Sequence, residues 1–489
     1  MKAPPRIPSP RPLEPFRADL RARMSRPQRH RLLHGYPMRP LMQPLAPSPK
    51  APEATLDIDP ARGLLVGVLP HTYCNPKVRG CGFCTFPHER HTNEGARESV
   101  ASVVRELEHR VTATPSLRGR RVEGLYFGGG TANLTPPDAF EALTRALEAA
   151  FDLRDAELTL EGVPVYFLTH DRALLRALAR TTARHRRLSM GVQTFDPEWL
   201  KKMGRERFGD HEKVRAVVGA AREADMTVSI DLLINLPERS LPACLDDLAR
   251  ACELQPEQIC LYNLVLAADL DAAWSEDEAL LAKLPSPERA FARWLAARAF
   301  LLENGYVQTT LTNFELATVA DTPRAFLYER ASFTPHLFDA LGFGPAGIST
   351  MTARGGGRCV KWQNHDTAEA YQAAIAAHGQ AAALRFTYST LDQKLLYLTR
   401  SFAQLSVPRA PYRERFGVEL EHDFPEALAV LSEARLLDDS NPEALRLTPD
   451  GMFYADAVAG LLASERARQL TGPRHGGRDP NDSRRGSMG

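Results

Sequence analysis

The chain of 489 residues is 44% hydrophobic and 25% charged, which is typical of a globular protein with two or three domains. Lys and Arg number 61 against 60 Asp and Glu, and this formal net charge of +1 argues against a strongly basic nucleic-acid-binding protein. The charge is unevenly distributed, because residues 1–50 hold eleven basic and two acidic side chains. Their net charge is +9, so the remainder of the chain carries −8.

Both ends of the chain are predicted to be disordered. Residues 1–58 form a basic arm, because residues 1–50 contain twelve prolines and little apolar periodicity. A transit peptide and a tether to nucleic acid or membrane are the alternatives, but the prolines would interrupt the amphipathic helix of a transit peptide. Residues 464–489 are polar and contain Gly and Pro. No apolar run of about 18 residues and no secretory segment occurs, so we expect a cytoplasmic protein without a membrane span.

Short apolar runs alternate with helical patterns from about residue 60 to residue 350. The runs, which we interpret as strands, are Gly63–Leu69, Gly124–Phe127, Glu157–Leu160, Leu188–Val192, Thr227–Ile234 and Gln258–Val265. The helical segments between them include Glu98–Val111, Pro137–Ala150, Arg172–Ala179, His211–Ala224 and Leu241–Leu254. This repetition predicts parallel strands, and six units favour a partial (β/α)6 TIM-like barrel over a doubly wound sheet. Ligands bind at the carboxyl ends of the strands in either architecture.

The pattern changes near Thr387. Residues 59–386 are therefore predicted to form the barrel and its extension, which includes the helix Pro287–Asn304. Residues 387–463 contain two helical patterns, Ser389–Gln404 and Phe424–Ala434, followed by a hairpin that leads into a helix. This order of elements predicts a small winged-helix-like α+β domain.

Seven cysteines are an odd number, and three of them lie close together in the sequence, directly after the first predicted strand. Cys74, Cys81 and Cys84 have the spacing Cys-x6-Cys-x2-Cys, which indicates metal ligation rather than a disulfide framework. Three thiolates can hold a cubane iron–sulfur cluster and leave one iron open for a ligand. Zinc is the competing interpretation, with a fourth ligand from the nearby histidines, His71, His88 or His91.

Polar residues and glycines follow several of the other strands. Gly128, Gly129, Gly130 and Thr131 end the second strand, where glycines allow the backbone to approach a ligand closely. The remaining candidates are Glu161 after the third strand, Gln193 after the fourth, Arg205 beyond it and Asp231 within the fifth. Their convergence on one edge of the sheet indicates a ligand that carries hydroxyl, ammonium and carboxylate groups.

These residues belong to longer motifs by which the chain resembles radical S-adenosylmethionine (SAM) enzymes of the oxygen-independent coproporphyrinogen III oxidase-like family. The motifs are YFGGGT (126–131), LEGVP (160–164), RLSMGVQTFD (187–196), GRE (204–206), SIDLLINLP (229–237) and GFGPAGIST (342–350). The resemblance extends from about residue 63 to residue 371, and more loosely to about residue 462. It implies a partial radical SAM barrel and makes zinc the weaker interpretation.

The resemblance also implies roles for individual residues. Cys74, Cys81 and Cys84 would ligate a [4Fe–4S] cluster, whose open iron binds the amino and carboxylate groups of SAM. The residues expected to contact SAM are Phe83, Gly129, Gly130, Thr131, Glu161, Gln193, Arg205, Asp231, Val265 and Ile348. Reduction of the cluster would cleave SAM to a 5′-deoxyadenosyl radical that abstracts a substrate hydrogen.

The chain departs from the family pattern in two places. The family spacing is Cys-x3-Cys-x2-Cys, so three residues are inserted here between Cys74 and Cys81. The family's Tyr-x-His-x-Pro segment is replaced by Val66-Gly-Val68-Leu-Pro70, although His71 and Tyr73 are close enough in sequence to substitute. The named activity is therefore open.

Four cysteines and one amide pair lie outside these motifs. Cys244, Cys252 and Cys260 occupy apolar positions and are predicted to be core residues. Cys359 lies in a polar loop, where a passive thiol is favoured over a reactive one. Gln363-Asn364 is interpreted equally well as a structural turn or as a substrate contact.

Three hypotheses of function follow. The first is a coproporphyrinogen dehydrogenase-like oxidoreductase with a porphyrin or other bulky substrate. The second is a radical SAM methyltransferase that uses a second SAM as methyl donor on a natural-product intermediate, and the third is a non-catalytic haem chaperone. The enzymatic hypotheses imply an electron donor such as flavodoxin or ferredoxin and a monomer that binds neither nucleic acid nor membrane. No residue is assigned to catalysis itself.

Overall fold

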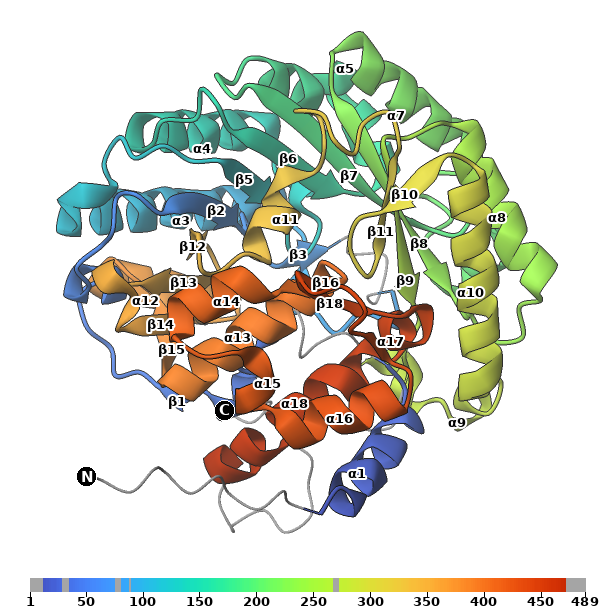
Figure 1. The fold of residues 1–489 in the computed structure, drawn as a ribbon. Coiled ribbons are helices and arrows are strands. Elements are labelled where there is room, and N and C mark those ends of the chain that lie inside the picture. Colours follow the sequence, from blue (N-terminus) through green and yellow to red (C-terminus); the bar gives the residue numbers. More distant parts are fainter. Residues whose placement is uncertain (1–11, 29–34, 75–80, 88, 267–271, 472–489) are drawn as a thin grey trace, which may run out of the picture.

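The computed structural model describes residues 12–28, 35–74, 81–87, 89–266 and 272–471, and a curved thirteen-stranded sheet dominates it (Figure 1). The strand order is β1-β15-β14-β13-β12-β2-β5-β6-β7-β8-β9-β11-β10. No helix in these ranges is both long and apolar enough to cross a membrane.

Six neighbouring parallel strands form the centre of the sheet. They are β2 (Gly63–Val68), β5 (Gly124–Phe127), β6 (Glu157–Gly162), β7 (His185–Gln193), β8 (Thr227–Ile234) and β9 (Gln258–Asn263). Helices from the crossovers cover the outer side: α3 (Asn93–Ala113), α4 (Pro137–Ala150), α5 (Pro164–Ala179), α7 (His211–Glu223) and α8 (Leu241–Glu253). The predicted partial barrel of six strand–helix units is confirmed, and the sheet does not close on itself.

Further strands extend both edges of this parallel unit. At one edge, β11 (Asn313–Leu316) and β10 (Tyr306–Gln308) are antiparallel and follow α10 (Pro287–Glu303). At the other, β12 (Phe338–Phe343) is parallel to β2. The outer strands there are the antiparallel β13 (Ile348–Thr352), β14 (Cys359–Asn364), β15 (Ala382–Tyr388) and β1 (Gln43–Pro44), with α12 (Ala368–His378) between β14 and β15.

A short helix inside the curve of the sheet, α11 (Leu327–Ser332), contacts β2, β5 and β12. The Glu157 carboxylate, at the start of β6, accepts hydrogen bonds from the backbone N–H groups of Leu327 and Tyr328 at 2.8 and 3.3 Å. This contact fixes the first turn of α11 at the amino-terminal end of the strands, and leaves the carboxyl ends for the site described below.

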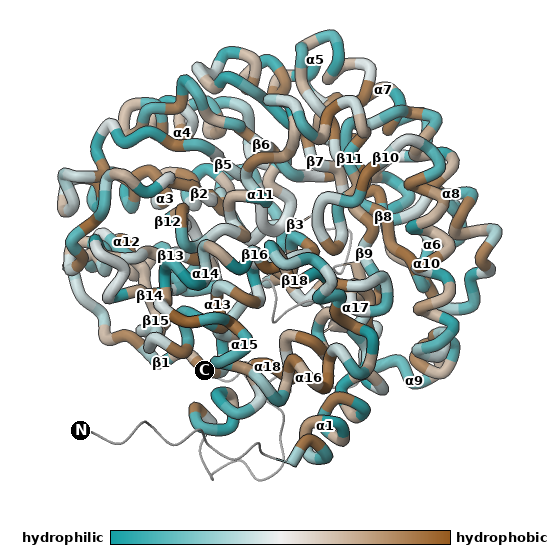
Figure 2. Tube along the Cα trace, viewed as in Figure 1, coloured by the Kyte–Doolittle hydropathy of each residue, from teal (hydrophilic) through white to brown (hydrophobic). Residues whose placement is uncertain are grey.

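The C-terminal residues form a second unit of helices and a three-stranded sheet in the order β16-β18-β17, as the winged-helix-like prediction required. Its strands are β16 (Ser406–Pro408), β17 (Leu437–Asp438) and β18 (Ala444–Leu447), and its helices are α13 (Thr390–Ala403), α14 (Arg409–Phe416), α15 (Leu420–Asp423), α16 (Pro425–Glu433), α17 (Pro449–Phe453) and α18 (Ala455–Thr471). One continuous hydrophobic core joins this unit to the barrel. Along the tube in Figure 2, hydrophobic segments alternate with hydrophilic ones on the outer helices, as expected for helices that bury one face.

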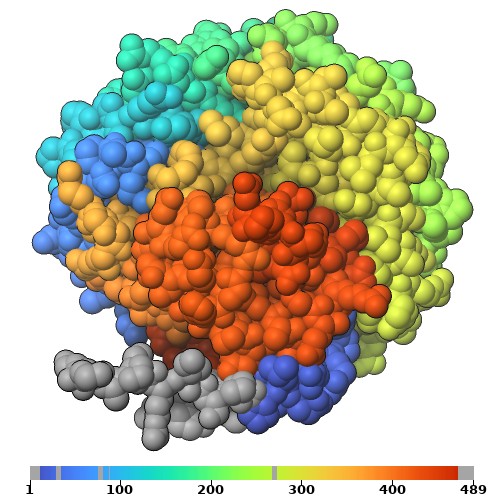
Figure 3. All heavy atoms as spheres, in the orientation of Figure 1, coloured from blue at the N-terminus to red at the C-terminus, as the bar shows by residue number. Residues whose placement is uncertain are grey.

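The prediction of a disordered arm over residues 1–58 is wrong for the described parts of that segment. Helix α1 (Glu14–Met24) packs against α18 and α16, and Figure 3 shows it beside the C-terminal unit. Phe16, Leu20 and Met24 of this helix, together with Leu13 just before it, recur at helical spacing, and this periodicity outweighs the prolines on either side. Residues 1–11 and 29–34 lie outside the described residues. The predicted tail also begins too early, because α18 continues to Thr471; residues 472–489 are not described.

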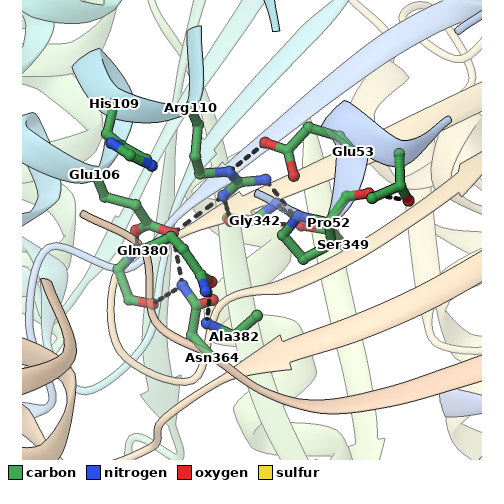
Figure 4. A network of polar contacts seen from close by, with 12 residues as sticks. Pro52, Glu53, Glu106, His109, Arg110, Gly342, Ser349, Asn364, Gln380 and Ala382 are labelled. Carbon is green, nitrogen blue, oxygen red and sulfur yellow. Dashed lines mark hydrogen bonds and ion pairs between the residues drawn. The ribbon is translucent and has the colours of Figure 1, made fainter. Parts of the chain in front are cut away.

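Residues 35–58 pack against the extension of the barrel. Figure 4 shows one network of these contacts, in which Arg110 on α3 lies between two carboxylates. Arg110 is 1% exposed and donates to Glu53 at 2.6 Å and to Glu106 at 3.1 Å. Asn364 donates to the same Glu106 at 2.9 Å and to the carbonyl of Gly344. The Gln363-Asn364 pair thus has a structural role through Asn364.

Candidate active site

A pocket of about 770 Å³, including the solvent-filled space at its mouth, opens at the carboxyl ends of the central strands. Its lining is Cys74, Cys81, Phe83, Cys84, Gly130, Thr131, Ala132, Glu161, Gly162, Val163, Gly191, Gln193, Arg205, Phe208 and Asp231. The sequence thus placed ten of these fifteen residues at one site.

The segment that carries the cysteines is held by backbone hydrogen bonds. Cys74 ends the two-residue strand β3 (Tyr73–Cys74), which pairs with β4 (Glu89–Arg90). The N–H of Thr131 donates to the Tyr73 carbonyl at 3.1 Å, and the N–H of His91 donates to the Cys74 carbonyl at 3.1 Å. Cys81 and Cys84 lie in a turn in which the N–H of Phe83 donates to the Cys81 carbonyl at 2.7 Å. The three residues inserted relative to the family fall within residues 75–80, outside the described part of the chain.

Two of the thiols accept hydrogen bonds from pocket residues. The Thr131 hydroxyl donates to Cys74 Sγ at 3.4 Å, and Arg205 Nη1 donates to Cys81 Sγ at 3.0 Å. Burial raises the pKa of Cys74 to about 11, while the Thr131 hydroxyl opposes this shift, and burial also raises the pKa of Cys84. Thiols in such surroundings stay protonated until a cation is bound, and binding of that cation then releases their protons.

Gly130 lets the chain after β5 approach the cysteine segment closely. Gly130 has φ +46°, and a Cβ atom there would lie 2.8 Å from the Tyr73 carbonyl oxygen, which real side chains do not tolerate. Gly130 and Thr131 therefore form the floor of the pocket directly beside Cys74. Gly129 is not among the lining residues and packs instead against Leu69 and Phe86.

Two carboxylates lie on the far wall of the pocket. Glu161 accepts a hydrogen bond from the Tyr126 hydroxyl at 3.2 Å, and burial raises its pKa. Asp231 has a pKa raised to about 7, first by burial and then by repulsion from Glu161. A cationic ligand between them would replace the missing solvation and return both to the charged form.

Arg205 lines the same pocket as the two carboxylates and contacts the cysteine segment through Cys81. Its Nη2 donates to the Gly191 carbonyl, and its guanidinium lies 4.8 Å from the ring centroid of Phe208. Its Nε is buried and has no hydrogen-bond partner. A guanidinium, two carboxylates and three thiols that line one pocket fit a ligand that carries both an anionic and a cationic group.

Several other predicted residues are placed elsewhere. Val265, after β9, and Ile348, which is 48% exposed at the start of β13, are not among the lining residues. His71 is fully buried, and its two ring nitrogens contact the N–H of Tyr73 and the hydroxyl of Thr135. His91 also lies outside the lining, and His88 outside the described residues. Among described residues, no group of three or more His, Cys, Asp and Glu side chains is arranged to hold a metal ion.

The prediction of a polar loop around Cys359 is wrong. This residue is 2% exposed on β14, and burial raises its pKa to about 11.

Five residues that line the pocket were not predicted individually from the sequence. Four of them lie in or beside quoted motifs, namely Gly162, Val163, Gly191 and Ala132, and only Phe208 has no sequence signal.

The family model of the radical SAM superfamily matches residues 68–248. This match spans the three cysteines, the glycine run and the four polar residues of the pocket. Over these residues the chain is therefore similar to the radical SAM superfamily.

Comparison with individual proteins shows which members of this superfamily the chain resembles. An oxygen-independent coproporphyrinogen III oxidase of Bradyrhizobium diazoefficiens is 27% identical over 400 residues, which are 78% of this chain and 82% of that protein. The heme chaperone HemW of Escherichia coli is 31% identical over 196 residues, 39% of this chain and 48% of the chaperone. The structure of Escherichia coli coproporphyrinogen III oxidase (HemN) matches with a TM-score of 0.69 at 22% identity, over 84% of this chain and 92% of that one. The predicted likeness to the coproporphyrinogen III oxidase-like family is confirmed.

Proposed function

We propose that this protein is a radical SAM enzyme in which Cys74, Cys81 and Cys84 hold a [4Fe–4S] cluster with SAM beside it. The proposal is carried by one observation: Arg205, whose guanidinium donates to Cys81 Sγ, lines the same pocket as the three cysteines, Glu161 and Asp231. When bound and reduced, the cluster supplies the electron that cleaves SAM to a 5′-deoxyadenosyl radical.

Different residues of the pocket would bind different chemical groups of SAM. The Arg205 guanidinium is available to a carboxylate, while Glu161 and Asp231 are available to an ammonium and a sulfonium or to ribose hydroxyls. Gly130 leaves space above the floor, and Phe83 offers a ring face for the adenine. Gln193 lies at an irregularity of the β7–β8 pairing with φ +73°, which directs its amide differently from its neighbours on the strand. We assign Gly129, Val265 and Ile348 to the surroundings of this ligand rather than to direct contact.

For the reaction, we propose hydrogen abstraction from a bulky porphyrin-like substrate, with oxidation of coproporphyrinogen III as the nearest named activity. The long alignment with an oxygen-independent coproporphyrinogen III oxidase supports this choice. The buried Val66 and Val68, in place of the family's Tyr and His, favour a related substrate over coproporphyrinogen III itself. Seven free thiols suit a reducing compartment such as the cytoplasm, with a flavodoxin or ferredoxin as electron donor to the monomer.

Anaerobic reconstitution with iron and sulfide, followed by product analysis, tests the proposal. Incubation with reductant, SAM and coproporphyrinogen III is expected to release methionine and 5′-deoxyadenosine. Protoporphyrinogen would identify the named activity, and its absence would point to another substrate. S-adenosylhomocysteine as an additional product would instead indicate the methyltransferase. Absence of SAM cleavage, together with stoichiometric haem binding, would favour the chaperone, which the similarity to HemW makes the second candidate.

The ligand assignment has its own matched pair of variants. Cys81→Ala is expected to abolish the EPR signal of the reduced cluster and to lower the bound iron. Cys359→Ala removes an equally free but fully enclosed thiol and is expected to retain the iron, at a cost of about 1 kcal/mol in stability. A full complement of iron with an unchanged EPR signal in Cys81→Ala would show that Cys81 is not a ligand.

A further inference from the structure

A second hydrophobic core, separate from the main one, lies beside the cysteine turn. Its buried members are Trp199, Met203, Leu236, Leu264 and Leu266, and Phe83, Leu233, Trp274, Leu280, Leu281 and Leu284 pack against it. We call this set the satellite core. Of the two hydrophobic clusters, only the satellite core includes an apolar residue of the turn between Cys81 and Cys84. That residue is Phe83, which does not belong to the main core.

Trp274 makes three contacts with this turn. Its backbone N–H donates to the Gly82 carbonyl at 2.8 Å. Its indole covers Gly82 so closely that a Cβ atom at this position would overlap the ring, and Gly82 has φ +69°. The ring centroids of Trp274 and Phe83 are 5.7 Å apart in an edge-on arrangement. The two residues between Cys81 and Cys84 are therefore both held by one side chain.

The satellite core also supports Arg205, the residue that donates to Cys81. Trp199 is on α6 (Pro197–Lys202), and its ring lies edge-on to Trp274 at 6.0 Å. The turn after α6 leads to Arg205, whose N–H donates to the Leu200 carbonyl at 2.7 Å. Trp274 thus packs against both the turn that carries Cys81 and the helix that leads to its hydrogen-bond donor.

We propose that Trp274 is a positioning residue that fixes the Cys81–Cys84 turn against Arg205 and shields this side of the cluster from water. The inference rests on the proposed ligand role of these cysteines. It predicts that loss of the indole frees the turn while leaving the main core intact, because Trp274 belongs to the satellite core alone.

Thiol reactivity tests the positioning role without any cofactor. In the metal-free protein, Trp274→Ala is expected to increase the rate at which Cys81 and Cys84 react with a thiol reagent by about tenfold or more, measured by peptide mass spectrometry. Trp274→Phe, which keeps a ring, is expected to restore most of the protection. Trp362→Phe removes part of a 1% exposed indole on β14 and serves as the control, with lower stability but unchanged reactivity at these two cysteines. Wild-type reactivity in a folded Trp274→Ala protein would overturn the proposal.

A double-mutant cycle with Gly82→Ala tests the contact itself. In the wild-type background the new Cβ meets the indole and strains the backbone, whereas in Trp274→Ala only the strain remains. The loss of reconstituted iron caused by Gly82→Ala is therefore expected to be smaller in the Trp274→Ala background, and additive losses would contradict the contact.

After reconstitution, Trp274→Ala is expected to shift the EPR signal and raise the midpoint potential of the cluster, because greater water access stabilises the more negative reduced state. An unchanged potential and signal would exclude the shielding role. If the wild-type protein itself binds no cluster, the proposed function fails, whereas the thiol measurement still decides whether Trp274 holds the turn.

Discussion

Arg205 combines three roles that separate residues could each perform only in part. It donates to Cys81 Sγ, donates to the Gly191 carbonyl and packs on Phe208. A planar guanidinium with donors in fixed directions can do this, whereas the ammonium of a lysine concentrates its donors at one point.

Arg205→Lys is accordingly expected to weaken SAM binding about tenfold to a hundredfold while the cluster iron is retained, because the three cysteines are unchanged. Equilibrium binding of SAM to the reconstituted protein measures this loss. Arg207→Lys, two positions away and exposed, is the matched control. Equal affinities in the wild type and Arg205→Lys would remove Arg205 from the SAM site.

At the scale of elements, buried charges attach the segment of residues 35–58 to the barrel. Arg110 compensates Glu53 and Glu106, which are almost fully buried, and further donates to the carbonyl of Gly342 at 2.7 Å. Removal of the cation leaves two carboxylates without a charge partner.

We expect Arg110→Met to lower the free energy of unfolding by about 3–5 kcal/mol, measured by urea denaturation. The double variant Arg110→Met with Glu53→Gln is expected to recover part of this loss, because one uncompensated charge is removed. A loss below about 1 kcal/mol in Arg110→Met would mean that the network contributes little.

Lys361 on β14 holds the same segment through a buried amine. Its Nζ donates to the carbonyls of Gly35 and Pro37, each at 2.9 Å, and burial lowers its pKa to about 7, with Arg400 adding to the shift. Between pH 7 and about pH 10 the unfolded chain therefore holds a proton that the folded chain has released. Unfolding takes up this proton, so this group makes the folded state more stable as the pH rises across that window.

The prediction is that the free energy of unfolding of the wild type, relative to Lys361→Met, increases from pH 7 to pH 9 by at most about 1.4 kcal/mol per pH unit. Urea denaturation of both proteins at pH 7, 8 and 9 measures it. Parallel pH profiles would show that the amine titrates outside this range.

At the scale of the whole molecule, the N-terminal helix is part of the packed structure. Leu20 is 3% exposed between α1 and the C-terminal unit, and Arg17 forms an ion pair with Glu433 at 2.9 Å. Gln28 accepts a hydrogen bond from the N–H of Ala457 at 3.1 Å, at the start of α18. The basic segment therefore joins the two ends of the chain.

Leu20→Asp is expected to lower the thermal unfolding midpoint, because it removes about 1.5–3 kcal/mol of apolar burial and adds an unpaired charge. Differential scanning calorimetry provides the measurement. Arg21→Ala, on the exposed side of the same helix, is expected to change the midpoint little. Equal midpoints for the wild type and Leu20→Asp would indicate that α1 does not pack on α18 in solution.

Local sequence patterns were sufficient to predict the six parallel strands at the centre of the sheet. Each of the six predicted strands is present, and β5 and β8 have the predicted bounds, because buried parallel strands are short apolar runs bounded by turns. The antiparallel extension was harder to predict. Cys359 belongs to a buried strand although its neighbours are polar, since the pairing of β14 with β13 and β15 decides its burial.

For the candidate site, the sequence alone grouped ten of the fifteen residues that line the pocket. Strand ends of parallel units converge on one edge, so Cys74, Glu161, Gln193 and Asp231 could be grouped from their positions after strands. Only the tertiary structure decided how they are arranged: the hydrogen bond from Arg205 to Cys81, the placement of Gly129 away from the pocket and the cover of Gly82 by Trp274. These contacts join segments far apart in the chain. Their geometry depends on the packing of whole elements, which no local pattern of residues records.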